Sequence, residues 1–188
     1  MRRIFFIALR LFLLMTVITG LLYPLAVTGL ATTLFPKASR GSLVTRKGEV
    51  VGSSLLAQSF DSPAYFWPRP SACGYGTMPS GASNLGPTSK ALRVQIAGRI
   101  RSWEAGTATD GVLFPEMVSA SGSGLDPHIS PEAARAQLAG IAKARRWNPE
   151  QMEAARQTLG EFTEHPLLGF IGQPRINIFL LNLAMDKI

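Results

Sequence analysis

The sequence predicts an α+β protein, in which a single N-terminal transmembrane helix is followed by one extracytoplasmic α+β domain. Residues 11–36 contain no formal charge and consist mostly of aliphatic and aromatic side chains. As a helix this stretch would be about 39 Å long, and a bilayer core of about 30 Å requires about 20 apolar residues. Residues 37–188 combine strand-like and helical patterns, and they are numerous enough to build one hydrophobic core.

The charges around the apolar stretch predict its orientation. Three arginines precede it, and no acidic residue occurs before Glu49. Because basic residues favour the cytoplasmic side, we expect residues 1–10 in the cytoplasm, residues 11–36 across the inner (plasma) membrane, and residues 37–188 outside.

A cleaved signal peptide is the alternative to a retained anchor. The apolar core of a signal peptide is typically about 7–15 residues long and is followed by a small-residue cleavage site. The stretch at 11–36 is longer, and no convincing Ala-x-Ala pattern follows it. The sequence therefore favours a single-pass membrane protein.

Small residues recur along one face of the expected membrane helix. Thr16, Gly20, Pro24 and Thr28 are spaced four apart, which places them in one stripe. Membrane helices associate through close backbone approach at small residues, so the stripe is a candidate helix-packing face. Gly and Thr are also common in membrane helices in general, which is the alternative explanation. Pro24 is expected to kink the helix, because it lacks a backbone N–H.

Strand-like patterns follow the membrane stretch. Residues 42–46 and 49–52 flank Lys47-Gly48, a pair typical of a tight hairpin. A further strand is expected at 55–60. The aromatic, proline-rich segment 65–70 that comes next excludes a regular helix.

Three helices with apolar faces are expected in the second half of the chain. Two of them begin with a side-chain cap followed by proline, at Ser130-Pro131 and at Asn148-Pro149. The expected helices span residues 89–105, 131–146 and 149–162, with a turn at Asp110-Gly111 and a closing strand at 176–183.

Two loops rich in Gly and Ser, at 69–88 and 119–131, are candidate sites for a partner or a ligand. Glycine lets a backbone approach a partner or an anion closely. The alternative, which the residues favour, is that the loops only brace each other. The candidate residues are Arg69, Pro70, Ser71, Ser83, Asn84 and Gly86 in the first loop, and Ser121, Gly122, Ser123, Gly124, Asp126 and His128 in the second.

No combination of residues identifies a catalytic or metal site. The chain lacks a Walker loop, a dinucleotide-binding glycine pattern and a nucleophile elbow. Cys73 is the single cysteine, which excludes an internal disulfide and a thiolate metal cage. Asp126 and His128 could both bind a metal, but two ligands from one loop do not make a site. We therefore expect no catalytic residue and no metal.

Two other functions remain as alternatives. One is a membrane-tethered extracytoplasmic hydrolase with Cys73 or Ser121 as its nucleophile, although neither lies in a recognisable catalytic signature. The other is an isolated secreted binding domain. A nucleic-acid partner is not expected, because the net charge of +7 comes without a basic cluster interleaved with aromatic residues.

Several segments resemble the C subunit of the Kdp potassium-transporting ATPase, the KdpC family. They occur in order over nearly the full length of the chain, and only Cys73 and residues 74–80 depart from the pattern. The matching segments are the apolar anchor and residues 65–72, 83–88, 119–131, 166–170 and 174–177.

The resemblance implies a non-catalytic accessory subunit of a high-affinity, ATP-driven potassium importer. Its implied partners are a potassium-channel-like subunit, a P-type ATPase subunit and a small single-span subunit. The implied roles are assembly of the complex and a chaperone-like increase in the ATP affinity of the ATPase subunit. ATP is thus the one cofactor suggested, with no site assigned. Since an extracytoplasmic domain has no ATP beside it, we expect any such effect to pass through the membrane helices or to involve another site.

Overall fold

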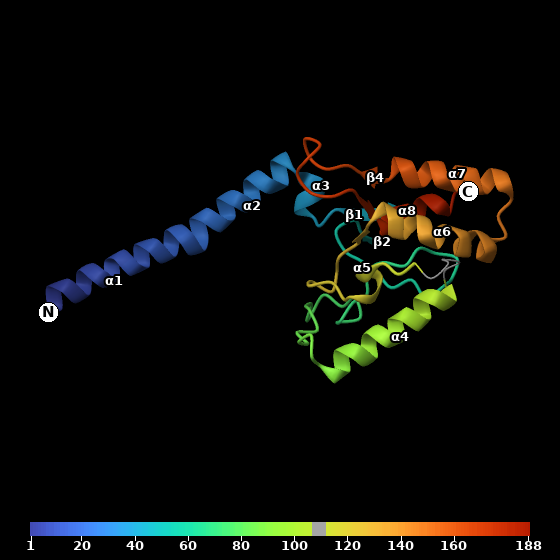
Figure 1. Cartoon of the computed structure of the whole chain (residues 1–188). Coiled ribbons are helices and arrows are strands. Elements are labelled where there is room, and N and C mark those ends of the chain that lie inside the picture. The colour runs from blue at the N-terminus through green and yellow to red at the C-terminus, as the bar shows by residue number, and fades with distance from the viewer. Residues whose placement is uncertain (107–111) are drawn as a thin grey trace. The chain divides into compact units, whose positions relative to one another are not determined.

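The computed structural model describes residues 1–106 and 112–188, which form two compact units, Met1–Ser53 and Ser54–Ile188. Both helix and sheet are present, which confirms the predicted fold class (Figure 1). The first unit contains α1 (Arg2–Val17), the π-helical turn η1 (Ile18–Leu22), α2 (Tyr23–Leu34), α3 (Pro36–Ser39), β1 (Leu43–Arg46) and β2 (Glu49–Ser53). The second contains α4 (Lys90–Gly106), α5 (Pro115–Val118), β3 (His128–Ile129), α6 (Pro131–Arg145), α7 (Pro149–Glu161), β4 (Thr163–Glu164), β5 (Arg175–Asn177) and α8 (Ile178–Met185). The turn expected at Asp110-Gly111 lies outside the described residues.

The first unit begins with one continuous helix, made of α1, η1 and α2, that is long and apolar enough to cross a membrane. It runs from Arg2 to Leu34, so it starts earlier than the apolar stretch at 11–36 and ends two residues before its end. Its large apolar side chains are exposed, which suits a surface that faces lipid.

The π-helical turn η1 lies directly before Pro24. In it the N–H of Tyr23 donates to the carbonyl of Ile18, five residues earlier. A wider turn accommodates Pro24, whose ring clashes with the carbonyl four residues earlier in a regular α-helix. The turn also affects the small-residue stripe. On a regular α-helix, residues four apart are rotated by about 40° around the helix axis, so a stripe with this spacing slowly winds around the helix. The wider π turn reduces that rotation between Thr16, Gly20 and Pro24.

The hairpin predicted around Lys47-Gly48 is confirmed. Strands β1 and β2 are antiparallel, and Arg46 pairs with Glu49 across the turn. Lys47 and Gly48 have φ values of +52° and +87°, the left-handed conformations that a tight two-residue hairpin turn of type I′ requires.

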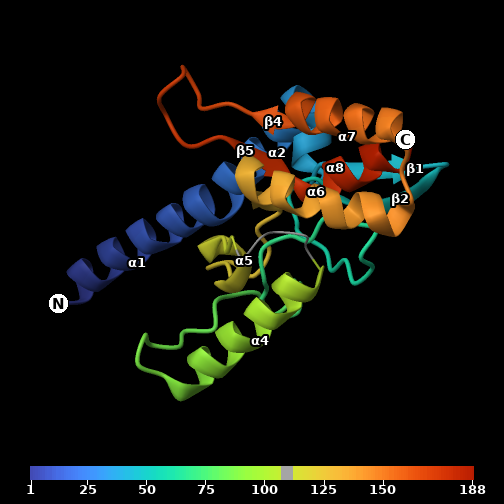
Figure 2. The same cartoon turned by 45° about the vertical axis from the view of Figure 1, so that its right-hand side comes forward.

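The three predicted helices of the second unit are confirmed as α4, α6 and α7. Helices α6 and α7 bury apolar residues, among them Leu138 and Ile141 on α6 and Ala155 and Leu159 on α7, whereas α4 buries Trp103 alone. Figures 1 and 2 both show α6, α7 and α8 grouped together, with α4 on the other side of the irregular segments. Strands β3, β5 and β4, in this order, form a small antiparallel sheet beside the grouped helices.

The closing strand predicted at 176–183 is wrong over most of its length. Only its start belongs to β5, and the chain continues as helix α8, in which the side chain of Asn177 caps the N–H of Leu180. Asn177 is also the last residue of the strand, so one residue ends the sheet and starts the helix. A short apolar run has no period that separates a buried strand from a buried helix.

The strand predicted at 55–60 is also wrong. The segment is irregular, and the N–H of Ala57 donates to the carbonyl of Leu125 at 2.9 Å. Four short elements, α3, α5, β3 and β4, were not predicted, because each is too short to show a hydrophobic period.

The aromatic segment 65–70 is packed in the core by two side-chain amides. Phe66 is fully buried, and both its N–H and its carbonyl bond to the amide of Asn182 on α8, at 2.9 Å each. The amide of Gln137 on α6 binds the backbone of Trp67 in the same way, at 2.8 and 3.2 Å. The segment thus receives from side chains the pairing that a neighbouring strand would otherwise provide.

Arg145, near the end of α6, joins the same segment to the C-terminus. Its guanidinium donates to the carbonyls of Ala64 and Met185 and to the carboxylate of Asp186. It also lies over the rings of Tyr65 and Trp147, at 4.9 and 5.5 Å from their centroids. Such a planar cation can serve several acceptors and two aromatic rings at once.

Replacement of Asn182 by leucine should therefore destabilise the fold. Asn182→Leu leaves a buried N–H and a buried carbonyl of Phe66 without partners, so we expect the free energy of unfolding to fall by about 3 kcal/mol. The measurement is urea unfolding of the full chain in detergent, followed by tryptophan fluorescence. Gln157→Leu, which changes an exposed amide on α7, is the matched control and should shift stability by less than about 0.5 kcal/mol. Equal effects of the two changes would contradict this role of Asn182.

Candidate functional site

The two Gly- and Ser-rich loops contact each other through backbone and glycine. The N–H of Ser121, a buried residue, donates to the carbonyl of Pro70 at 3.0 Å. Gly124 has φ +71°, and a Cβ there would collide with the sulfur of Cys73 and lie 2.9 Å from the carbonyl of Gly81. The loops therefore pack too closely at this point for any side chain on residue 124.

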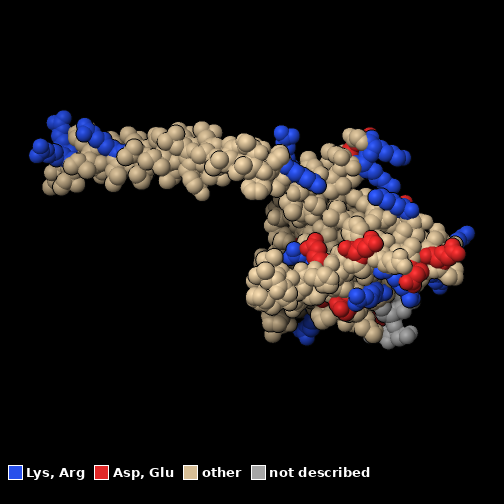
Figure 3. All heavy atoms as spheres, turned by 90° about the horizontal axis from the view of Figure 1, so that it is seen from above, with Lys and Arg blue, Asp and Glu red and all other residues tan. Residues whose placement is uncertain are grey.

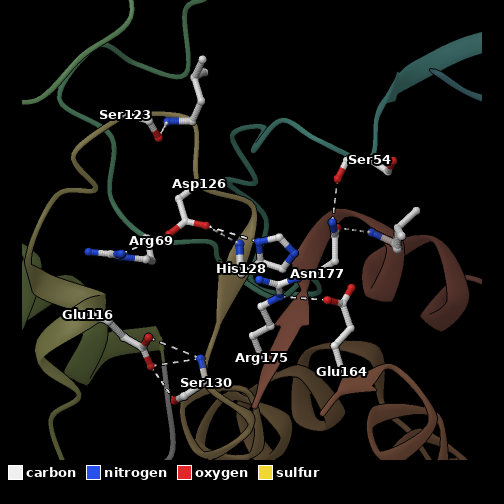
Figure 4. A network of polar contacts seen from close by, with 12 residues as sticks. Ser54, Arg69, Glu116, Ser123, Asp126, His128, Ser130, Glu164, Arg175 and Asn177 are labelled. Carbon is white, nitrogen blue, oxygen red and sulfur yellow. Dashed lines mark hydrogen bonds and ion pairs between the residues drawn. The ribbon is translucent and has the colours of Figure 1, made fainter. Parts of the chain in front are cut away.

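Asp126 forms the main polar link between the loops (Figure 4). Its Oδ2 accepts from Nη1 of Arg69 at 3.0 Å, and its Oδ1 accepts from the backbone N–H of His128 at 3.0 Å. The Nδ1 of His128 lies 3.4 Å from the same Oδ1. One carboxylate from the second loop thus holds the start of the first loop and fixes its own turn.

The surroundings of Asp126 favour its charged form. Burial by itself would raise the pKa of this carboxyl, but the hydrogen bonds from His128 and Arg69, together with the positive charge of Arg69, lower the pKa below its ordinary value. The ion pair is about 30% exposed on both sides, so solvent screens part of its energy.

A groove of about 280 Å³ lies beside this link, and its charged side chains make ion pairs or hydrogen bonds with protein groups. Glu116 accepts from the N–H and the hydroxyl of Ser130, the cap of α6. Arg175 donates to Glu164 at 2.8 Å. The groove is lined by Arg69, Glu116, Asp126, His128, Ile129, Ser130, Gln173, Pro174 and Arg175. Glu116, Asp126 and Arg175 thus bond to protein groups, and Arg69 does so through Nη1, while its buried Nε has no partner among the described residues. These contacts favour a bracing role over ligand binding.

The remaining candidate residues of the first loop lie closer to α4. Asn84 is exposed with φ +53°, and Ser83 is half-buried. The carbonyl of Gly86 accepts from the N–H of Ser89, which begins the turn into α4. In the second loop, Gly122 and Ser123 are exposed, and the hydroxyl of Ser123 accepts from the N–H of Leu125.

The side chains considered for a hydrolase do not form a catalytic set in the described part of the chain. Ser71 lowers the pKa of Cys73 most strongly, through a hydrogen bond of 3.3 Å, and the Gly81 backbone adds to the effect. No hydrogen bond among the described residues joins Cys73 or Ser121 to a histidine. Among the same residues, no three His, Cys, Asp or Glu side chains gather as metal ligands.

A second groove, of about 350 Å³, lies between the first loop and α4, and Phe60, Tyr75, Arg99 and Trp103 are among its lining residues. The hydroxyl of Tyr75 donates to the carbonyl of Arg69, and burial raises the pKa of Tyr75. Arg99 donates to the carbonyl of Val118 at 3.0 Å. Tyr75 and Arg99 therefore each bind backbone, at Arg69 and at the end of α5.

In the membrane helix, the small-residue stripe is exposed along its length. The hydroxyl of Thr16 donates to the carbonyl of Phe12, and the carbonyl of Thr28 accepts from Thr32. No atom lies within 4 Å of a Cβ built on Gly20. The hydroxyl of Thr16 is thus satisfied within the helix, and the Gly20 position is open to close approach.

Sequence reasoning missed three residues that organise the domain: Gln137, Arg145 and Asn182. A signal existed for two of them, since Gln137 and Asn182 interrupt otherwise apolar helix faces. A polar residue at a core position must find a partner, but the sequence does not say which backbone it binds.

These features define a class: a membrane-anchored α+β protein with one candidate spanning helix, whose polar loops brace each other. Comparison with known proteins identifies the family. The sequence pattern of the family described as "K+-transporting ATPase, c chain" matches residues 5–187. The chain belongs to this family, the KdpC family, as the resemblance indicated.

Relatives match the chain over nearly its whole length. The potassium-transporting ATPase KdpC subunit of Rhodospirillum rubrum is 50% identical over 183 residues, which cover 96% of this chain and 93% of the relative. The subunit of the same name from Citrifermentans bemidjiense is 50% identical over 185 residues, covering 96% and 95%. That of Polaromonas naphthalenivorans is 46% identical over 185 residues, covering 96% and 93%.

The close loop contact predicts different effects at two neighbouring glycines. Gly124→Ala should lower the free energy of unfolding by about 2–4 kcal/mol, because the new Cβ collides with Cys73 and the backbone is left-handed. Gly122→Ala meets no atom within 4 Å and should change stability by no more than about 0.5 kcal/mol. Denaturant unfolding of both variants measures the difference. If Gly124→Ala is as stable as Gly122→Ala, the loops do not pack as described.

Proposed function

We propose that this chain is a non-catalytic, single-span accessory subunit of an ATP-driven potassium importer, and that the importer requires it for assembly and stability. The observation that carries the proposal is the match to the K+-transporting ATPase c chain over residues 5–187. The helix Arg2–Leu34 and the self-braced loops support it, since they suit a subunit that works by binding neighbours.

The proposed contact in the membrane is the stripe of Thr16, Gly20, Pro24 and Thr28. The hydroxyl of Thr16 and the carbonyl of Thr28 bond within the helix, and Gly20 leaves the backbone open on that face. Helices pack in lipid where small residues let backbones approach. We assign this face to the helices of a potassium-channel-like subunit, a P-type ATPase subunit or a small single-span subunit of the same complex.

The proposed orientation follows the charges at the ends of the helix. Arginines cluster at its amino-terminal end, and the middle of the helix carries no charge (Figure 3). By the positive-inside bias, residues 1–10 lie in the cytoplasm, residues 11–36 cross the inner membrane, and residues 37–188 lie outside, next to the channel-like subunit.

This orientation restricts how the subunit could raise the ATP affinity of the ATPase subunit. A domain outside the cell meets no ATP, and the sequence has no Walker loop. In our proposal the effect on ATP therefore reaches the ATPase subunit through helix packing in the membrane, and the chain needs no nucleotide site of its own.

A bulky residue at Gly20 should weaken assembly. Gly20→Leu blocks close helix approach, so we expect less of the other subunits to co-purify with the tagged chain from detergent-solubilised membranes. Gly29→Leu, also open within 4 Å but nine residues further and on another side of the helix, is the control. Equal recovery of the complex with both variants would rule out this face.

The orientation predicts which terminus is accessible. A tag at the carboxyl terminus should react with an impermeant reagent in intact spheroplasts, whereas a tag at the amino terminus should react only after lysis. The two tagged proteins control for each other, and lysed cells give the full signal for both. The opposite pattern would place the domain in the cytoplasm and overturn the proposed topology.

A further inference from the structure

The connection between β4 and β5 carries an exposed apolar hairpin, residues 167–171. Leu167, Leu168, Phe170 and Ile171 are 68%, 76%, 76% and 50% exposed. Elsewhere in the described part of residues 54–188, large hydrophobic side chains are exposed singly or as one adjacent pair. Four together on one short segment form a patch of the kind that marks a binding surface.

Most backbone N–H groups of the hairpin form hydrogen bonds with nearby carbonyls, as an apolar environment requires. The N–H groups of Leu167 and Ile171 bond to each other's carbonyls, at 3.0 and 2.9 Å. Those of Gly169 and Phe170 bond to the carbonyls of Pro166 and Leu167. Leu168 has φ +53°, a left-handed conformation that is unfavourable for leucine. The turn thus displays apolar side chains at the cost of local strain, and four of its five backbone N–H groups bond within it or to Pro166.

We propose that this hairpin inserts into the surface of the bilayer that the chain's own helix crosses, as a second, shallow membrane contact of the domain. The inference rests on the proposed function, because it requires the helix to be a membrane anchor. Apolar side chains of interfacial segments reach about 5–10 Å into the boundary of headgroups and acyl chains, a depth that a tight hairpin can match.

Two observations favour lipid over a protein as the partner of the hairpin. Four side chains are a small patch, whereas a stable protein interface usually buries more than about 1,000 Å². A domain tethered to the membrane needs only weak affinity for lipid, because the tether keeps the local concentration of the bilayer high.

The charges beside the hairpin indicate an apolar rather than an electrostatic contact. Glu164 and Arg175, at its two ends, pair with each other at 2.8 Å, and His165 is the one other titratable group between them. The flanks thus carry little net charge. Insertion should therefore occur in zwitterionic lipid and should not weaken when salt is raised.

Depth-dependent quenching in vesicles tests the inference. The full chain, with Cys73→Ser to remove the native thiol, carries one new cysteine labelled with the environment-sensitive fluorophore NBD. The labelled positions are Phe170→Cys in the hairpin, Leu21→Cys in the membrane helix and Ala144→Cys, an exposed site on α6. Phosphatidylcholine vesicles contain lipids with a nitroxide either near the headgroup or at the end of the acyl chain.

We expect the label at residue 170 to emit at shorter wavelength than the label at 144, and to be quenched more by the shallow nitroxide than by the deep one. Addition of Leu168→Asp should abolish this quenching, and Asp tolerates the left-handed backbone at that position. A label at 170 that behaves like the one at 144, while residue 21 is quenched by the deep nitroxide, would overturn the inference and leave the proposed anchor intact.

Two further outcomes would also overturn the inference. A label at residue 21 that no nitroxide quenches would refute the membrane anchor, and the hairpin contact with it. A label at 170 that becomes shielded only when the other subunits are present, without quenching by lipid, would identify a protein as the partner of the hairpin.

Discussion

The structure of the domain depends on how the backbone of Phe66 and Trp67 is paired. The segment is rich in aromatic residues and proline and does not join a sheet, yet Phe66 lies fully buried. Buried backbone groups without partners are costly. The amides of Asn182 and Gln137 supply two bonds each, from α8 and from α6. This pairing fixes the start of the first loop, because Arg69 follows only two residues later.

Once the first loop is fixed, the second loop is positioned by contact with it. Asp126 binds Arg69, Ser121 binds the backbone of Pro70, and Gly124 fits against Cys73. Arg69 and Asp126, the charged pair of the two loops, are thus directed at each other, which supports the bracing that the sequence favoured. Two apolar surfaces among the described residues carry the proposals: the small-residue face of the membrane helix and the 167–171 hairpin.

Secondary structure was predicted correctly where the sequence contains a hydrophobic period over several turns, a helix cap or a characteristic turn pair. The hairpin at Lys47-Gly48, the membrane-length helix and helices α4, α6 and α7 all follow from turn residues, uninterrupted apolar composition or capped amphipathic patterns. Helix α8 was mistaken for a strand, because its residues are apolar on every side and show no period.

The candidate site was predicted only in part. The two loops were identified by composition, but the way they pack against each other depends on contacts between residues far apart in sequence, such as Arg69 and Asp126. The exposed hairpin could not be distinguished from a buried turn, because burial is a property of the fold. The roles of Gln137 and Asn182 likewise could not be predicted, because only the fold shows which backbone segment lies next to each side-chain amide.

The position of Asn182 has a consequence for how the chain matures. Its partner Phe66 precedes it by 116 residues. Arg145 likewise bonds to Met185 and Asp186, which lie 40 and 41 residues further along the chain. The core around Phe66 therefore closes only once α8 has been synthesised and has docked, and until then the buried backbone of Phe66 lacks its partner. Contacts between residues so far apart in sequence form slowly, because a long stretch of chain must be ordered before they are made.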